Sequence, residues 1–170
     1  MKDILLVDGY NIIGDWPELK ALRETDLAEA RDRLIQKMAE YQAYNGWEIK
    51  VVFDAHMVEG VGGKYKDYLV DIIYTRENET ADERIEKLVG ELKNIETRVH
   101  VATSDYAEQS LTFGSGALRK SAPELRVEME LVEQNITREV TKQPKHENMS
   151  NIPLSREIAE IFDKWRRGGR

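Results

Sequence analysis

The sequence predicts an α/β fold in which helices flank a mostly parallel central sheet. Short apolar runs alternate along the chain with longer segments whose apolar residues recur at helical spacing. Three of the apolar runs end on an aspartate: Ile4 to Asp8, Ile49 to Asp54 and Val99 to Asp105. Parallel strands need long crossover connections, which are usually helices, so this alternation favours a parallel sheet.

In the first half of the chain, the three residues from Gly9 to Asn11 predict a turn after the first strand, and a short segment begins at Trp16. A helix is predicted from about Asp26 to Tyr44, with its buried face formed by Leu27, Ala30, Leu34, Met38 and Tyr41. Gly46 should end this helix, because glycine tolerates the left-handed cap conformation.

In the second half, residues from Tyr68 to Thr75 predict a strand, because they are rich in β-branched and aromatic side chains. A helix should follow from Ala81 to about Ile95, with Ile85, Leu88, Leu92 and Ile95 on its buried face. After the strand that ends near Asp105 comes another helix, and the glycines at 114 and 116 then interrupt the chain. A long helix should begin near Ser121 and bury Leu125, Met129, Val132, Ile136 and Val140. A polar loop over about 141–153 precedes a last amphipathic helix capped by Ser155.

Length and composition predict a single domain over residues 1–170, in which residues 121–170 form a helical C-terminal extension. No apolar run approaches the roughly 20 residues of a membrane span, so no contact with a membrane is expected. The chain has no cysteine, which excludes disulfides and thiolate metal sites. Because the first apolar run is too short for a signal peptide, we expect a cytoplasmic protein.

Charge is unevenly distributed along this acidic chain, whose formal net charge is −7. Residues 1–118 contain 14 Lys and Arg against 23 Asp and Glu, whereas residues 119–170 contain 11 against 9. Most of these charges are explained by solvated helix faces. An acidic protein can nevertheless bind RNA through local basic patches, so the overall charge does not exclude a nucleic-acid substrate.

Four acids are predicted to meet at one edge of the sheet. Asp8, Asp54 and Asp105 follow three strands, and Asp82 opens a helix. The carboxyl ends of parallel strands form the functional edge of an open sheet. Carboxylates gathered there repel one another unless a cation neutralises them, and oxygen ligands without thiols suit Mg²⁺ or Mn²⁺. The pattern indicates an acidic metal site of the kind that acts on phosphates.

Each acid also has a structural explanation. Asp8 and Asp54 can each begin a turn, and Asp105 can cap the helix that follows it. Thr80 and Glu83 form a predicted capping box, in which Asp82 favours the helix dipole. Capping explains a carboxylate at a helix start, but it does not explain why every major strand ends on one.

These acids lie within motifs that resemble those of a known family. The motifs are Val7-Asp8-Gly9-Tyr10-Asn11, Val52-Phe53-Asp54-Ala55, Glu79-Thr80-Ala81-Asp82 and Thr103-Ser104-Asp105. In order and spacing they resemble the YacP-like members of the NYN domains, a branch of the PIN-like nucleases, over nearly the whole chain. The resemblance implies a metal-dependent endoribonuclease that cuts mRNA in association with the ribosome.

The resemblance also implies a role for each motif residue. Asp8, Asp82 and Asp105 would be catalytic and would hold Mg²⁺ or Mn²⁺, with Asp54 as a further ligand or a nearby acid. Asn11 would donate a hydrogen bond to a phosphate oxygen or to water. The hydroxyls of Thr80 and Ser104 would orient the groups that contact the metal. Hydrolysis in this way leaves a 5′-phosphate and a 3′-hydroxyl and requires no catalytic histidine, so His100, within a strand, is expected to be structural.

RNA must approach this acidic edge despite its own charge, so basic side chains should flank it. The candidates for phosphate contacts are Lys64, Lys66, Arg119 and Lys120, and His56 is a weaker one. Single-stranded RNA is the expected substrate, because its bases can stack on exposed aromatic rings. Tyr10, Tyr65 and Tyr106 are candidates for that role, although each of them could equally be a core residue.

Two other classes of protein compete with the nuclease interpretation. Doubly wound phosphatases and receiver domains also place aspartates at strand ends, but the second acid that both expect near the first strand is missing after Asp8. A noncatalytic RNA- or ribosome-binding module on the same fold is the other alternative. Clustered carboxylates give no advantage to a protein that only binds polyanions, and this argues against the noncatalytic module.

Overall fold

The computed structural model describes residues 1–55, 70–142 and 161. Its centre is a five-stranded sheet in the order β3-β2-β1-β4-β5, in which every pair of neighbouring strands is parallel. The strands are β1 (Lys2–Asp8), β2 (Glu48–Phe53), β3 (Asp71–Tyr74), β4 (Thr97–Ala102) and β5 (Leu118–Lys120). The predicted α/β fold with a parallel sheet is therefore confirmed.

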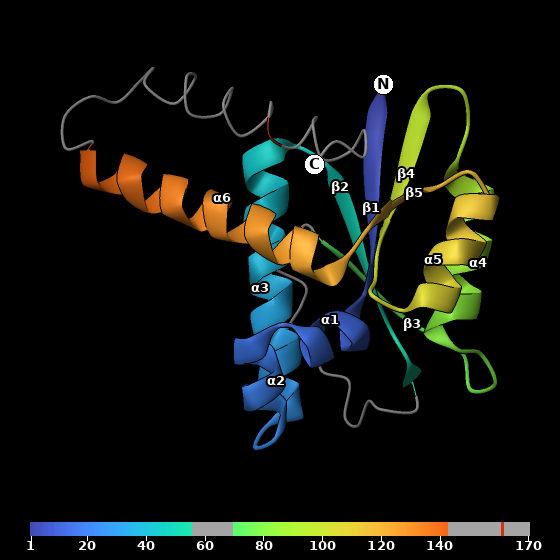
Figure 1. Ribbon diagram of the computed structural model, residues 1–170, viewed down its shortest axis with the longest axis horizontal. Helices are drawn as coiled ribbons and strands as arrows, with labels where there is room; N and C mark the ends of the chain where they lie inside the picture. Colours follow the sequence, from blue (N-terminus) through green and yellow to red (C-terminus); the bar gives the residue numbers. More distant parts are fainter. Residues whose placement is uncertain (56–69, 143–160, 162–170) are drawn as a thin grey trace.

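Helices cover both faces of the sheet (Figure 1). One face carries α1 (Gly9–Asp15), α2 (Pro17–Arg23), α3 (Leu27–Asn45) and α6 (Ala122–Lys142), and the other carries α4 (Ala81–Leu92) and α5 (Tyr106–Gly114). Side chains of β1 alternate between two cores, because successive residues of a strand point to opposite faces. Leu5 and Val7 pack with α3 and α6, whereas Ile4 and Leu6 pack with α4. The central strand is thus buried on both sides.

The long helices begin and end where their capping residues predict. The Asp26 carboxylate accepts a hydrogen bond of 3.0 Å from the Glu29 amide at the start of α3. Gly46 ends α3 with a φ of 77°, a conformation that costs glycine little. At α6, the Ser121 hydroxyl oxygen accepts the Glu124 amide at 3.2 Å, which fixes the helix start beside β5.

The predicted end of α4 is wrong. The helix stops at Leu92, and the Asn94 side chain accepts the Glu96 amide at 2.8 Å in a tight turn into β4. Ile95 is therefore 92% exposed, although its spacing places it on the buried helical face. The side-chain hydrogen bond of Asn94 offers the backbone an alternative to another helical turn.

Two other regions differ from prediction at the carboxyl edge. The residues after Asp8 form α1 directly rather than a turn, and β5 is a strand that the sequence did not predict. The Thr103 amide donates to the Lys120 carbonyl at 3.0 Å, so this short strand extends the sheet beside β4. Ile161 is helical and packs against the core formed with α3 and α6, and the rest of the predicted last helix lies outside the described residues.

Within the described residues, no helix is both long and apolar enough to cross a membrane.

Candidate metal centre

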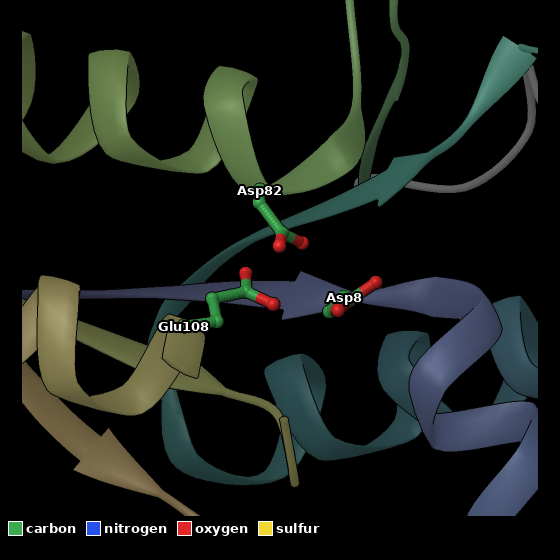
Figure 2. Close-up of side chains that lie close together, drawn as sticks. All are labelled: Asp8, Asp82 and Glu108. Carbon is green, nitrogen blue, oxygen red and sulfur yellow. The ribbon is translucent and has the colours of Figure 1, made fainter. Parts of the chain in front are cut away.

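Three carboxylates meet at the carboxyl edge of the sheet (Figure 2). Asp8 is the last residue of β1, Asp82 lies in the first turn of α4, and Glu108 lies in the first turn of α5. One oxygen from each side chain lies within 4.8 Å of the others. Asp82 and Glu108 extend toward each other from their two helices, beside Asp8 at the end of the strand. Residues far apart in the sequence therefore form one acidic group.

Asp8 is held in place by the close approach of α1 to β2. A Cβ on Gly9 would lie inside contact distance of the Phe53 ring, so only glycine lets α1 begin directly after Asp8. The Phe53 ring is itself packed against Tyr10, with 5.0 Å between the ring centroids. Asp8 is buried at the junction between β1 and α1.

Asp82 owes its position to the start of α4. The Thr80 hydroxyl accepts the Glu83 amide at 3.2 Å, and the Glu83 carboxylate accepts the Thr80 amide at 2.9 Å. This is the predicted capping box, and it is confirmed. Glu79 anchors the same helix through Arg84 and Lys87, both at 2.8 Å, and these hydrogen bonds lower the pKa of Glu79 to about 2.

Glu108 is joined to Asp8 through a shared neighbour, Thr103. The Thr103 hydroxyl lies 3.3 Å from Asp8 Oδ2 and 3.2 Å from Glu108 Oε2. Its oxygen also accepts the Asp105 amide at 3.1 Å. Because a hydroxyl has one hydrogen, it donates to one of the two carboxylates at a time. Thr103 thus links the two carboxylates and gives its hydrogen to only one of them at a time.

The electrostatics of the group favour bound positive charge. Burial, reinforced by the neighbouring Asp8 and Asp82, raises the pKa of Glu108 to about 10. Burial likewise raises the pKa of Asp8, and the charge of Asp82 adds to the effect. Without a cation, three ionised carboxylates at this edge are therefore unfavourable, because desolvation and like charge both oppose ionisation.

The donor set fits a hard divalent cation. Glu108 is only 1% exposed, and its buried Oε1 receives no hydrogen bond from the described residues. A buried polar oxygen without a partner is costly, and a cation would satisfy it. The three side chains offer only carboxylate oxygens, the ligands preferred by Mg²⁺ and Mn²⁺. The residues present therefore fit the metal ion that the sequence predicts.

Two predicted acids lie outside this group. The Asp105 side chain is exposed, and its Oδ1 accepts the Glu108 amide at 3.2 Å as the cap of α5. Asp54 follows β2, where Thr75 holds the turn by accepting the Ala55 amide at 2.9 Å. Both acids lie at the carboxyl ends of strands, as predicted, but the three mutually close oxygens belong to other residues.

Asn11 and Ser104 join α1 to the end of β4. The Asn11 side-chain oxygen accepts the Ser104 amide at 2.7 Å, which turns the amide nitrogen of Asn11 away from that bond. The Ser104 hydroxyl oxygen accepts the Ala122 amide at 3.0 Å at the start of α6. Both residues thus hold the edge together, and Asn11 retains two N–H donors for another partner.

The structure corrects the prediction for one basic residue. Lys120 is buried on the α3 face of the sheet, where its ammonium lies 2.6 Å from a carboxylate oxygen of Glu128. It is not available to an RNA phosphate. Arg119, its neighbour on β5, is exposed. Lys64 and Lys66 lie outside the described residues, as do His56 and Tyr65.

His100 agrees with its predicted structural role. It is buried within β4, and its Nε2 lies 3.0 Å from Asp3. Burial opposes ionisation of Asp3, but hydrogen bonds with His100 and Arg98 outweigh it and lower the pKa of Asp3.

Glu108 is the residue that the sequence prediction missed. Its spacing from Asp105 is that of a capping box, which gives a glutamate at the third helical position an ordinary structural purpose. In the structure the carboxylate of Glu108 instead bonds with Thr103 and faces Asp8. The available signal was position alone: a glutamate in the first turn of a helix that begins at the acidic edge.

Comparison with known proteins gives consistent matches over nearly the whole chain. The family model of the YacP-like NYN domain matches residues 5–167. The chain is 58% identical over 166 residues to the Bacillus subtilis (strain 168) protein YacP, covering 98% of both. The crystal structure of Rae1 (YacP) from Bacillus subtilis matches with a TM-score of 0.78 at 58% identity, covering 98% of this chain and 95% of that one. The crystal structure of a mutant of the same Bacillus subtilis protein matches with a TM-score of 0.74 at 55% identity, covering 98% of this chain and 96% of that one.

Proposed function

The chain belongs to the YacP-like NYN domain family of PIN-like nucleases, and from this premise we propose that it is a metal-dependent endoribonuclease that cleaves single-stranded RNA. The observation that supports the proposal most directly is the group formed by Asp8, Asp82 and Glu108, with a buried oxygen that receives no hydrogen bond from the described residues. A protein that only binds RNA has no use for such a group, because its charge repels phosphate.

Asp8, Asp82 and Glu108 would hold the ion, and Asp54 and Asp105 are further acids at the same edge. A bound Mg²⁺ or Mn²⁺ supplies a water of lowered pKa and positive charge beside the phosphate. The protein's own contribution is to fix the three carboxylates. Thr103 links two of them, and the capping box positions the third.

Polar and basic residues around the acids would bind the substrate. Asn11 is oriented by the Ser104 amide, so its side-chain N–H groups can donate to a phosphate oxygen or to water without adding charge. Arg119 is an exposed cation on β5 and would contact the RNA backbone, as would Lys64 and Lys66. Thr80 and Ser104 act indirectly, by holding the helix starts in place.

Within this activity, the substrate we propose is mRNA engaged with the ribosome in the cytoplasm. We also propose that residues 1–170 form one domain, with residues 121–170 as its helical extension. The packing of α6 against α3 supports the proposal of a single domain, because Leu125, Met129 and Val132 belong to the same core as α3.

The test is cleavage of a labelled single-stranded RNA with Mg²⁺, with Mn²⁺ and with EDTA. We expect internal cuts that leave 5′-phosphates and that EDTA abolishes. Asp8→Asn, Asp82→Asn and Glu108→Gln should each lower kcat by orders of magnitude while the fold survives, because a metal contributes several kcal/mol to the barrier. Asp26→Asn is the control, because asparagine caps α3 about as well as aspartate.

Asp105→Asn separates the two roles of that residue. If Asp105 acts mainly as the cap of α5, the variant should lose much less activity than Asp8→Asn. The proposal fails if wild-type protein cuts no RNA under any of these conditions, on ribosomes or free. It also fails if the three carboxylate variants cleave at the wild-type rate.

A further inference from the structure

The exposed apolar side chains of the described residues are few, and one of them stands apart. Met1, Ile95, Tyr106 and Val127 are the large hydrophobic residues that face solvent. Met1 and Ile95 lie at the amino ends of strands, and Val127 lies on α6. Tyr106 alone follows the carboxyl end of a strand, at the edge where the three carboxylates meet.

The fold itself does not use the Tyr106 ring. The side chain is 82% exposed, so nearly all of its ring lies in solvent. Two other described tyrosines, Tyr10 and Tyr74, lie at this edge, and both rings pack within the protein. The Tyr10 hydroxyl lies 3.1 Å from Arg31, and the rings of Tyr10 and Tyr74 both pack on Phe53. A large ring left in water is unusual, since aromatic side chains contribute to stability mainly through the area that they bury.

The position of Tyr106 relates it directly to the acidic group. It is the first residue of α5 and precedes Glu108 by two residues, which corresponds to a rise of about 3 Å along the helix. The two side chains leave the helix in different directions, because Glu108 is buried and Tyr106 is exposed. Residues two apart in an α-helix differ by about 200° in direction, so the ring lies on the solvent side of the same helix start whose inner side carries Glu108. An RNA strand that reaches the carboxylates from solvent would therefore pass this helix start.

We propose that the Tyr106 ring is a stacking platform for the base of a nucleotide that flanks the scissile phosphate. This inference rests on the proposed nuclease function. Asp82 and Asp105 also reach solvent at this edge. A basic side chain placed here to bind RNA would compete with the metal ion for the carboxylates, whereas an aromatic ring binds a base without adding charge. Base–aromatic stacking contributes about 1–3 kcal/mol per base. In a duplex both faces of each base are already covered, so the platform selects single strands.

The first test compares Tyr106→Ala with Tyr106→Phe, which keeps the ring and removes only the hydroxyl. With a short single-stranded RNA, Tyr106→Ala should raise KM about 5- to 150-fold and change kcat much less. Tyr106→Phe should stay within about threefold of wild type. Ile95→Ala is the matched control, because it removes another highly exposed apolar side chain, at the opposite edge of the sheet. Equal KM values for Tyr106→Ala and wild type would overturn the proposal.

The second test locates the base. A series of otherwise identical oligonucleotides, each with one abasic nucleotide, is assayed for kcat/KM with wild type and with Tyr106→Ala. Wild type should lose activity when one nucleotide beside the cleaved bond lacks its base, and the variant should be indifferent at that nucleotide. The proposal is overturned if the abasic penalty at every position is the same in both proteins.

Failure of the nuclease proposal would look different. If wild type cleaves none of these oligonucleotides, their affinity is measured instead by fluorescence anisotropy in the presence of Mg²⁺. The same pattern of abasic penalties would then support stacking by Tyr106 on a noncatalytic RNA-binding surface. An affinity that is equal for both proteins would exclude the platform independently of catalysis.

Discussion

Replacing Lys120 by methionine should destabilise the fold far more than the loss of an exposed cation would. The Lys120 ammonium lies 2.6 Å from Glu128 Oε2, and the two residues are 1% and 0% exposed. The other Glu128 oxygen accepts a hydrogen bond of 2.9 Å from Tyr41. Burial raises the pKa of Glu128 even beside Lys120. In Lys120→Met the Glu128 carboxylate would stay buried, with the Tyr41 hydroxyl as its remaining hydrogen-bond donor among the described residues.

The expected cost of that change is about 3–5 kcal/mol, which is the usual penalty for removing one partner of a buried ion pair. For a domain of this size, each kcal/mol lowers Tm by about 2–4 °C, so the shift should be about 6–20 °C. The double variant Lys120→Met with Glu128→Gln removes both charges and keeps an acceptor for Tyr41. It should recover most of the loss.

Urea denaturation followed by tryptophan fluorescence measures these differences, and Trp47 is a suitable reporter because Lys120 lies 6.0 Å from its ring. Arg119→Met is the matched control on the same strand, and it should stay within about 0.5 kcal/mol of wild type. A single variant that loses less than about 1 kcal/mol would refute the reasoning, because the usual penalty is several times larger. So would a double variant as unstable as Lys120→Met.

Three further predictions concern packing, pH and substrate contact. Gly9→Ala should destabilise the protein by about 1–3 kcal/mol, because its methyl group would overlap the Phe53 ring; thermal melts should show partial rescue by Phe53→Leu. Glu79→Gln should lower Tm by an amount that is constant above about pH 5 and that vanishes as the pH falls toward 2. The reason is that the folded state lowers the pKa of Glu79 from 4.5 to about 2, so the stabilisation by Glu79 is lost as its carboxylate takes up a proton. A Tm difference between wild type and variant that does not change with pH would contradict this. Arg119→Ala should weaken RNA binding equally for different sequences and reduce the salt slope by about one unit, which affinity measurements across a salt series would check. An unchanged affinity and slope would exclude Arg119 from the RNA interface.

The sheet and the long helices were predictable because their signals are local and repeated. Helical spacing over α3 and the caps at Asp26 and Gly46 agree with one another, so the prediction was within one residue at each end. The signals that failed are single side-chain hydrogen bonds. Asn94 ends α4 early and leaves Ile95 exposed against its periodicity. β5 has three residues, too few for an alternation to be visible.

Lys120 shows why charge alone does not reveal a binding surface. In the sequence, Arg119 and Lys120 are one basic pair, and both suit an RNA phosphate. Neighbouring residues of a strand point to opposite faces, however, and β5 pairs with β4 so that Lys120 enters the core of α3 and α6. Its partner Glu128 lies eight residues away on a helix face that also buries Leu125, Met129 and Val132. Without knowledge of β5, nothing distinguishes the two cations.

The sequence predicts where the acidic group lies, but it does not predict which three residues form it. The rule that parallel strands end at one functional edge correctly joined Asp8 to the start of α4, where Asp82 lies. For the third carboxylate, the choice between Asp105 and Glu108 depends on the direction in which α5 leaves the sheet. The Asp105 side chain faces the helix amides, and that bond turns the first helical turn so that Glu108 faces inward. At this edge Asp105 therefore caps α5, and Glu108, three residues later, belongs to the acidic group. A change at Asp105 would act on the metal centre through the orientation of Glu108.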